Sequence, residues 1–555
     1  AGIPLSLVLN DLRPEENAND RFAIIIYDQA NRPVFSIDAY GYVTQNFYDG
    51  AGKVTDVIAY NTAIDLSLLP EAPQISDITL VASSSDRLVR TFYDNDGNLI
   101  ASLDSEGYLS ENFYDTAGRV FNNIVYATQT DPVNQVSGDL ASLRPATSLD
   151  DISSYIFYNA QNQVVARLDG ENFLTQITYD VSGNVTQITA YANRAAAWFL
   201  GAQLSDLTPL SSVDDRTVSN SYDSLSRLVS SVSYEGTVST NTYDAVGNLI
   251  STSVAVGTSE VRTSTRRYDN EGRVLAELSP IGVDLITQNP TASQAEIDAI
   301  WAVHAITNLY DSAGQLLAVT DQNGNKTIFY YDQAGRQIFT VSAEGAVSEN
   351  RFDSFSQAVE VRAYANLLNA TQLAALNGGT VNTLVSSIMS DLASDNDISN
   401  FTDYDLRGAV WRAIDAEGYA GINEFNAFGE LVTSRQQISS SDFLVSNLLY
   451  DNRGLLISSI EDAEGVAALN RTLVTTYDAF GRSIKQTDAN GQDYLYGYDK
   501  LGRVITVTDP LGNTLSTEYD AFGQTLKTYD ASGNAITYIY DNTERSLSIF
   551  TAEGI

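Results

Sequence analysis

The chain has 555 residues, and its 70 acidic side chains against 31 basic ones give a net charge of −39 at pH 7. So acidic a surface repels phosphate and makes nucleic acid and anionic membrane poor partners; the absence of cysteine and the single histidine exclude disulfides, thiolate chemistry and the usual zinc sites. A hydrophobic content of 43% excludes a disordered protein, and without a run of about 18 apolar residues no membrane insertion is expected.

The N-terminal stretch AGIPLSLVLNDLRPEENAND lacks the basic and apolar regions of a signal peptide. We interpret residues 1–26 as a lead-in or partial repeat, because the regular pattern begins at Tyr27. The chain stops at TAEGI, where that pattern should continue with a strand, so we expect a fragment of a longer protein. The remaining residues, 27–555, are predicted to form one continuous repeat region.

A Tyr-Asp pair recurs through this region. With three variant pairs it gives 19 anchors, and ten of the 18 steps between consecutive anchors are 21 residues long. A fixed period of this kind indicates a repeat architecture. The anchors are Tyr27, Tyr48, Tyr93, Tyr114, Tyr158, Tyr179, Tyr222, Tyr243, Tyr268, Tyr310, Tyr331, Phe352, Tyr404, Phe425, Tyr450, Tyr477, Tyr498, Tyr519 and Tyr540.

Each 21-residue unit has two halves, as the segment from Tyr498 to Asp520 shows. YDKLGR is followed by VITVT, then by DPLGN and TLSTEYD. The short runs between the glycine-containing clusters are rich in β-branched and aromatic residues, and in TLSTEY alternate residues point to opposite faces. The sequence therefore predicts an all-β protein built of two-stranded hairpin units.

The Asp-x-x-Gly clusters have two readings. The Asp side chain can bind backbone amides two residues on while the Gly takes a positive φ, which is turn chemistry. The stretch DNDGN at Asp94 also resembles the start of a calcium loop, but its twelfth position is Ser105 where a Glu is required. Turn chemistry is favoured, with loosely bound calcium as the alternative and no other cofactor expected.

The clearest units define the residues that we assign to the structural repeat. They are Tyr477, Asp478, Gly481, Arg482, Asp488, Gly491, Tyr498, Asp499, Gly502, Arg503, Asp509, Gly512, Tyr519 and Asp520. The tyrosines are predicted to pack against the next unit and to satisfy their hydroxyls at the sheet rim. The alternative is an exposed aromatic ladder that stacks on sugar rings.

Five longer steps, of 45, 44, 43, 42 and 52 residues, indicate insertions, and helical insertions are predicted near residues 61–90, 127–155, 193–217, 284–306 and 366–400. Four of them follow a phrase such as IAYN or IVYA. Helices are expected over Asn193–Leu204, over residues 293–306 with Ser293 and Glu296 as a capping box, and as two short helices broken at Gly378-Gly379 within residues 370–393.

Few residues suggest catalysis. His304 is expected to be packed or hydrogen-bonded, because no second histidine or cysteine can complete a site. The carboxylate pairs Asp150-Asp151 and Asp214-Asp215 are attributed to chance adjacency in an acidic chain, and Asp395-Asn396-Asp397 to a cation-friendly loop. The tryptophans Trp198, Trp301 and Trp411 are expected to anchor insertions into the core.

The phrase Tyr-Asp-x-x-Gly-Arg, as in YDTAGR, YDNEGR, YDQAGR, YDAFGR and YDKLGR, resembles the YD repeat of the Rhs family. The resemblance implies a strip of β-hairpins that spirals into a hollow shell or an arc of one. In bacterial Rhs toxins, Tc toxin components and animal teneurins such a shell encloses a cargo or scaffolds cell-surface contacts. The self-cleavage motif of toxin-releasing members is not carried over, because Asp509-Pro510-Leu511-Gly512 occupies an ordinary turn position.

These features favour a non-enzymatic structural protein, secreted or at the cell surface, that forms part of a shell. Its expected partner is an encapsulated or C-terminal cargo domain. The alternative is an extracellular adhesin or carbohydrate-binding scaffold with a cell-surface ligand, and an enzyme acting on an extracellular polymer is the weakest reading. The oligomeric state stays open.

Overall fold

The computed structural model describes residues 20–196, 202–463, 469–541 and 546–551. In these residues 39 strands form one antiparallel sheet, in which each strand pairs with the next along the chain. The exception is β25 (Gly379–Thr380), a two-residue strand that pairs in parallel with β21 (Lys326–Tyr331), so that β24 (Ala358–Ala363) pairs directly with β26 (Ile398–Tyr404). The prediction of an all-β chain of hairpins is confirmed.

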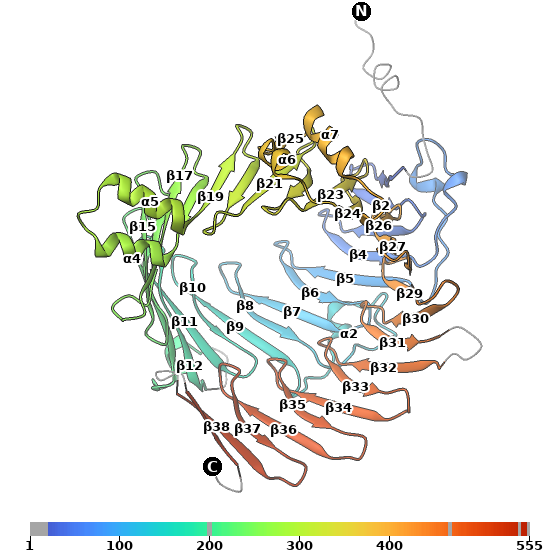
Figure 1. Ribbon diagram of the computed structural model, residues 1–555. Helices are drawn as coiled ribbons and strands as arrows, with labels where there is room; N and C mark the ends of the chain where they lie inside the picture. Colours follow the sequence, from blue (N-terminus) through green and yellow to red (C-terminus); the bar gives the residue numbers. More distant parts are fainter. Residues whose placement is uncertain (1–19, 197–201, 464–468, 542–545, 552–555) are drawn as a thin grey trace, which may run out of the picture.

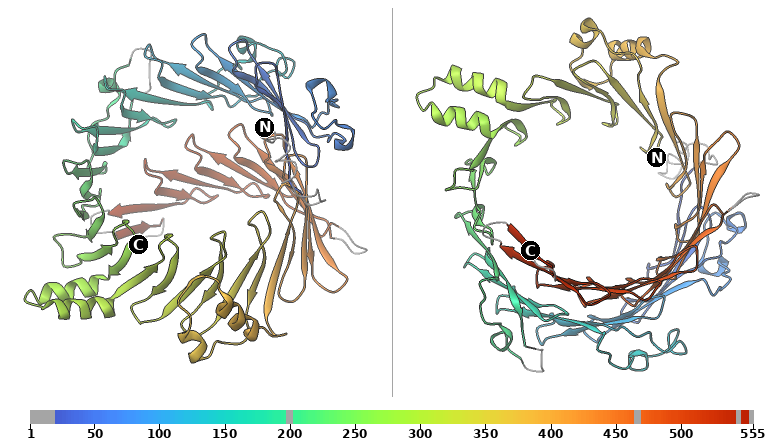
Figure 2. Two further views of the ribbon diagram at one scale, coloured as in Figure 1. Left: turned by 90° about the horizontal axis from the view of Figure 1, so that it is seen from above. Right: turned by 60° about the horizontal axis from the view of Figure 1, so that its bottom comes forward.

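The strip of strands curves into a ring and continues beside its own beginning as a coil that does not close on itself (Figures 1 and 2). The first revolution, from β1 to β22, comprises Ile24–Tyr27, Pro33–Ile37, Val43–Tyr48, Val54–Ala59, Arg87–Tyr93, Leu99–Leu103, Leu109–Tyr114, Val120–Val125, Ile152–Tyr158, Val164–Leu168, Phe173–Tyr179, Val185–Arg194, Arg216–Tyr222, Leu228–Val232, Val238–Tyr243, Leu249–Val254, Arg262–Tyr268, Val274–Leu278, Ala305–Tyr310, Leu316–Thr320, Lys326–Tyr331 and Gln337–Val341.

The second revolution runs from β23 to β39 and lies alongside the first, as the orange and red strands beside the blue and teal ones in Figure 2 show. Besides β24, β25 and β26 it comprises Val347–Phe352, Val410–Ile414, Ala420–Phe425, Leu431–Gln437, Phe443–Tyr450, Leu456–Glu461, Arg471–Tyr477, Ser483–Thr487, Asp493–Tyr498, Val504–Thr508, Thr514–Tyr519, Thr525–Tyr529, Ala535–Asp541 and Ser546–Phe550.

Each unit turns twice, once at either rim of the strip. After Tyr498 ends β34, the amide of Asp499 donates to the carbonyl of Arg503 at 3.0 Å, and the ladder shifts register by one residue beside Tyr498. After β35 the same kind of turn forms between Asp509 and Asn513. We call the edge of turns that follow the anchors the YD rim, and the edge of second-half turns and insertions the insertion rim.

The insertions lie on the convex side of the ring, where Figure 2 shows the helices and long loops projecting outward. They bury the strand residues beneath them: Leu103 and Leu109 of the sheet pack with Tyr126 and Leu143 of one insertion, and all four are at most 6% exposed. The core is therefore a series of separate clusters, one under each covered stretch, instead of one central core.

The helices of the insertions are short. Within the described residues, which leave out 197–201 of the third insertion, the first three insertions hold only single turns, η1 (Leu66–Leu68) and η2 (Ile75–Asp77), α2 (Leu140–Leu143) and α3 (Leu204–Leu207). The last two hold α4 (Pro280–Gln288) with α5 (Gln294–His304), and α6 (Ala370–Ala374) with α7 (Thr383–Leu392). None of the helices in the described residues has the length and apolar composition to cross a membrane.

Two of the three helix predictions are confirmed. α5 begins with the predicted capping box of Ser293 and Glu296, and α6 and α7 are separated at Gly378-Gly379. The helix over Asn193–Leu204 is wrong at its start, because Asn193 and Arg194 extend β12, where Arg194 pairs with Phe173. Strand pairing there outweighs the helix preference of the following alanines; residues 197–201 lie outside the described residues.

The proposed division of the chain remains a prediction. The lead-in of residues 1–26 lies mostly outside the described residues, and β1 begins inside it, at Ile24. From β1 onward the hairpins follow one another through to β39, interrupted only by the insertions.

Candidate functional site: the repeat turns and the concave wall

The Asp that begins a YD turn accepts backbone amides through Oδ1, and where Arg stands at the fifth position it also uses Oδ2. Asp499 Oδ1 accepts from the amides of Leu501 and Arg503, at 3.0 and 2.9 Å, and Oδ2 pairs with the Arg503 guanidinium, whose Nε lies at 2.6 Å. The other end of that guanidinium donates to the carbonyl of Asp520 in the next turn, at 2.6 Å. Asp478 and Arg482 repeat this arrangement and reach Asp499. The Asp therefore folds its own turn, and the Arg ties neighbouring turns together.

The second-half turns use the same carboxylate without the arginine. Asp509 Oδ1 accepts from the amides of Leu511 and Asn513 at 2.9 and 2.8 Å, and Asp488 does so from Asn490 and Gln492. Gly512 has φ +84°, a backbone conformation in which a Cβ is strained. In these loops Asp and Gly therefore act as turn residues, as the sequence indicates.

These bonds shift the titration of the turn carboxylates. The side-chain amide of Asn98 and the backbone amides around it lower the pKa of Asp94, and the side chain of Arg227 does the same to Asp223. In the DNDGN stretch, both oxygens of Asp94 are occupied by donors from its own turn. In the part of the chain that the structure describes, no group of three or more His, Asp or Glu side chains is placed to hold a metal ion.

The anchor tyrosines bind their neighbouring hairpins. From Tyr48 to Tyr540 each anchor is half-buried, and the Tyr519 hydroxyl donates to the carbonyl of Val504, the first residue of the preceding strand, at 3.0 Å. Comparable bonds of 2.7 to 3.0 Å are made by Tyr48, Tyr114, Tyr158, Tyr179, Tyr222, Tyr243, Tyr268, Tyr331, Tyr404, Tyr450, Tyr477 and Tyr498.

Two residues before several anchors stands an asparagine whose side chain donates to the carbonyl that the anchor tyrosine also binds. The sequence analysis did not predict this bond. Asn112 Nδ2 and the Tyr114 hydroxyl both donate to the carbonyl of Leu99, at 3.1 and 2.9 Å. Asn241 and Tyr243 converge in the same way on Leu228. The repeated Asn-x-Tyr at the end of a strand was the available signal. Both side chains lie on the face opposite the insertions, which is the concave face of the ring.

The concave face carries little charge. Alternation from each anchor places the residues two and four positions before it on this face, and at these positions the 19 anchored strands have no Asp or Glu. Asn, Ser, Thr, Ile and Tyr predominate instead, as in Asn112 and Ser110 before Tyr114. The many acidic residues of the chain belong mainly to the turns of the two rims and to the convex face.

Each of four insertions is closed by an aspartate. Asp151 accepts from the amide of Ala127 at the start of its insertion and from that of Ser148 near its end, at 2.9 and 2.8 Å. Asp86, Asp215 and Asp397 do the same for their own insertions. We call this aspartate, bonded to amides at both ends of its insertion, a clasp. The phrase Ser-x-x-Asp that ends each insertion is the signal that could have predicted it.

The clasps give one member of each carboxylate pair a structural role. Asp151 and Asp215 accept from backbone amides at the two ends of their insertions, and the neighbouring Asp150 and Asp214 take no part in these bonds. The Asp395–Asp397 loop is a clasp as well, because Asp397 binds the amides of Ala365 and Ser394.

In each of these insertions a tyrosine hydroxyl also donates a hydrogen bond to a Gln or Glu side chain on the convex face of the sheet. The Tyr126 hydroxyl donates to Glu111 Oε1 at 2.8 Å, and Arg144 pairs with the other oxygen of Glu111 at 2.7 Å. Burial, and then the bond to the Glu111 carboxylate, raise the pKa of Tyr126. Tyr60, Tyr191 and Tyr364 bind Gln45, Gln176 and Glu349 in the same manner. The insertions are thus variants of one docking arrangement.

Of the four singled-out aromatic and histidine positions, three lie in the described residues, and two of these behave as predicted. Trp301 lies on α5, is 9% exposed and packs with Leu278, and His304 ends that helix half-buried. The expectation for Trp411 is wrong, because it lies on strand β27, is 38% exposed and lines a surface hollow of about 550 Å³ with Tyr40 and Tyr404. Trp198 lies outside the described residues.

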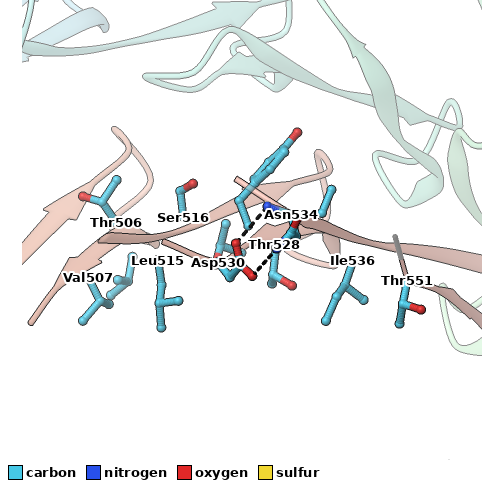
Figure 3. A pocket seen from close by; sticks show the side chains of 13 residues that line it. Thr506, Val507, Leu515, Ser516, Thr528, Asp530, Asn534, Ile536 and Thr551 are labelled. Carbon is cyan, nitrogen blue, oxygen red and sulfur yellow. Dashed lines mark hydrogen bonds between the residues drawn. The ribbon is translucent and has the colours of Figure 1, made fainter. Parts of the chain in front are cut away.

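A hollow of about 610 Å³ near the C-terminal strands does not form a catalytic site. Its lining residues leave the sheet on both sides: Figure 3 shows Val507, Leu515 and Ile536 pointing one way and Thr506 and Ser516 the other. The carboxylate among them, Asp530, is bound by Asn534 of its own turn. Nothing in this hollow brings a nucleophile, a base and an anion-stabilising group together.

Comparison with known proteins finds a repeat family and several solved structures. The family model described as RHS Repeat matches residues 310–347 and 477–514. Among solved structures, the chain is similar to TcdB2-TccC3-TEV, with a TM-score of 0.32, 11% identity, and coverage of 99% of this chain and 37% of that one. For TcdB2-TccC3-Cdc42 the values are 0.33, 11%, 100% and 37%.

A Tc holotoxin pore of Photorhabdus luminescens is similar with a TM-score of 0.28 and 11% identity, covering 99% of this chain and 37% of that one. The chain therefore spans little more than a third of the length of these proteins. No sequence among the curated proteins matches it.

Proposed function

We propose that the chain, which matches the RHS Repeat family model over residues 310–347 and 477–514, is a structural repeat protein of the Rhs, or YD-repeat, family and forms part of a shell wall that encloses a cargo or carries a terminal domain. It acts without catalysis of its own. The wall is the curved strip of hairpins, with the insertions outside and the concave face toward the enclosed space (Figure 2).

The engagement of the anchor tyrosines carries this proposal. An adhesin or carbohydrate-binding scaffold would need an exposed aromatic ladder, whereas here the anchors are half-buried and their hydroxyls bind main-chain carbonyls of the neighbouring hairpin. The tyrosine hydroxyls therefore hold neighbouring strands together. A sugar would have to compete with these bonds to gain the same hydroxyls.

The chemistry of the concave face supports an enclosing role. Carboxylates are absent from the positions two and four before each anchor, and Arg266, which stands at one of them, is neutralised by Glu277 at 3.0 Å. This face therefore offers little field to fix a charged group. Its asparagines and tyrosines are already bonded to carbonyls of the wall, as Asn112 and Tyr114 are. Such a surface suits a cargo that is held by confinement instead of by specific contacts.

The test is cryo-electron microscopy, with intact-protein mass, of the protein isolated from its natural source. We expect a mass well above 60.2 kDa and density inside the coil that the wall does not account for. An empty coil in every particle class, with all of the mass assigned to the wall, would overturn the enclosing role and leave a scaffold.

A further inference from the structure

The two revolutions of the coil meet along a seam, where the YD rim of the second revolution rests on the insertion rim of the first. The side chains that bond across it are 308 to 366 residues apart in the chain. Two kinds of contact recur along this seam at fixed positions of the repeat. They stand beside single bonds such as those from the Ser105 hydroxyl to the Asn452 carbonyl and from Lys500 Nζ to the Asp151 carbonyl.

The first kind is an arginine at the beginning of a first-revolution strand. Arg87, which begins β5, donates from both terminal nitrogens to the Glu430 carboxylate at 2.8 Å, and its guanidinium stacks 3.7 Å from the centre of the Phe428 ring. Arg216, which begins β13, donates to Gln524 at 2.7 Å and stacks on Phe522 at 3.9 Å. Arg21 near β1 contacts Phe355 and Gln357 in the same way.

The second kind is an acceptor in the third position of a second-half turn. Glu106 Oε1 accepts from the amide of Asn452, and Glu171 Oε1 from that of Lys500, both at 2.8 Å. The Tyr40 hydroxyl accepts from the amide of Leu406 at 3.1 Å. Each donor is the residue that follows the first residue of its turn, Asp405, Asp451 or Asp499, so one amide in each of these turns is capped by the other revolution.

The seam explains departures from the repeat. The fifth position of the YD turn is Arg in turns such as those of Arg119 and Arg336, but it is Gln357, Glu430 and Gln524 where a first-revolution arginine arrives. The third position of those three turns is Phe. Ile152 begins β9, at the position that Arg87 has in β5, and lies near the turn that starts at Asp478. That turn has Arg482 at its fifth position and Phe480 at its third. The three turns that receive a first-revolution arginine thus carry an acceptor at the fifth position, although Gln163 and Gln315 show that acceptors also occur there outside the seam.

The seam is held differently from the sheet. Neighbouring strands share a continuous ladder, for example Leu495 to Tyr498 against β35. Apart from the short pairing of β25 with β21, the revolutions meet through separate side-chain contacts. The Arg87–Glu430 pair is the most buried of the ion pairs across the seam, with side-chain exposures of 16% and 14%. Arg407–Asp38 and Arg21–Asp353 are longer, at 3.8 and 3.9 Å, and more open to solvent, with exposures of 20% to 30%. Burial at the seam also raises the pKa of Asp104 and of Asp169, the first residues of the turns that carry Glu106 and Glu171.

From this geometry we propose that the seam is a separable closure of the wall. The second revolution docks on the first through these paired contacts. When salt screens the charges, the second revolution separates from the first while the strands of the sheet stay paired. Ion pairs at partly exposed positions weaken as the screening length falls to about 3 Å at 1 M salt, while the backbone ladder does not depend on charge. The inference goes beyond the enclosing role, because it holds whether or not a cargo is present.

Amide hydrogen exchange, read by mass spectrometry with residue resolution, tests it on the unaltered chain. We expect the amides of Asn452 and Lys500 to exchange about tenfold faster or more in about 1 M sodium chloride than in about 0.05 M. The amides of β34 and β35 should keep their protection. Unchanged exchange at the two turns, or an equal loss in the strands, would overturn the proposal.

Two matched pairs of variants locate the effect. Arg87→Gln should speed exchange at Asn452 already at low salt, whereas Arg262→Gln, at the equivalent start of β17 and exposed, should not. Glu106→Ala should do so as well, and Glu417→Ala, the third residue of a second-half turn in the second revolution, should not. If each control matches its partner, the seam is not what protects these amides; if only Arg87→Gln and Glu106→Ala act, it is.

Discussion

The clasp of the second insertion gives the sharpest prediction of stability. Replacing Asp151 with Asn keeps the shape of the side chain but removes its charge and one of its two acceptor oxygens. Asp151 is 9% exposed and holds the amides of Ala127 and Ser148 at 2.9 and 2.8 Å. One amide then keeps a weaker neutral bond, and the other faces the NH₂ group without an acceptor.

The size of the effect follows from these two bonds. A hydrogen bond to a charged group contributes about 1.5 to 3 kcal/mol, and a buried amide left without a partner costs a similar amount. The insertion should therefore open about 3 kcal/mol more easily, which corresponds to roughly a 150-fold loss of protection from exchange. The amides to follow are those of Tyr126 and Thr130, which bond to Leu109 and Gly107 across the insertion.

Asp150→Asn is the matched control, because Asp150 is the adjacent carboxylate and is exposed. It should change protection by less than about threefold, as surface substitutions usually do. An equal effect of both variants, or less than a tenfold loss in Asp151→Asn, would refute the reasoning that the clasp closes the insertion. Exchange is preferred to global unfolding because a repeat of this length need not unfold in one step.

Three further predictions concern the repeat itself. Tyr519→Phe should cost about 1 kcal/mol in urea unfolding, through loss of the bond to Val504, and Tyr27→Phe, at an anchor that is 49% exposed, should cost less; equal costs would contradict the role of the hydroxyl. Gly512→Ala should cost about 1 kcal/mol through its positive φ alone, whereas Gly378→Ala should cost more in the same assay, because its Cβ would also meet the carbonyl oxygen of Leu317. Circular dichroism should show acid destabilisation below about pH 4, since bonds within the turns lower the pKa of Asp94, Asp223 and Asp509 from 3.8; groups with lowered pKa stabilise the fold above that value and lose the contribution as pH falls, and a flat profile down to pH 2 would contradict this.

Much of the fold could be predicted because its determinants are local. The 21-residue period, the alternation in TLSTEY and the Asp-x-x-Gly turns each act within one hairpin, and the strand Thr514–Tyr519 has the predicted bounds. The capping box of Ser293 and Glu296 is equally local. In each case the residues that bond to one another lie within a few positions, so their pattern is visible in the sequence.

The remaining features depend on distant partners. Arg87 and Glu430 lie 343 residues apart, and nothing near either residue indicates that they meet. Asn193 and Arg194 look helical from their alanine-rich neighbours, but pairing with β11 makes them a strand. Trp411 would be buried only if an insertion covered β27. The spacing of the repeat does not show which strands the insertions cover.

The seam and the enclosing wall both require that the 555-residue chain forms a curved wall of two revolutions instead of a straight strip. Electron microscopy of the isolated chain, with small-angle X-ray scattering of the same sample, tests this most directly. We predict a ring-shaped particle whose second revolution lies beside the first, as in Figure 2. A solid rod or an extended ribbon under the same conditions would contradict the coil, the seam and the enclosing wall together.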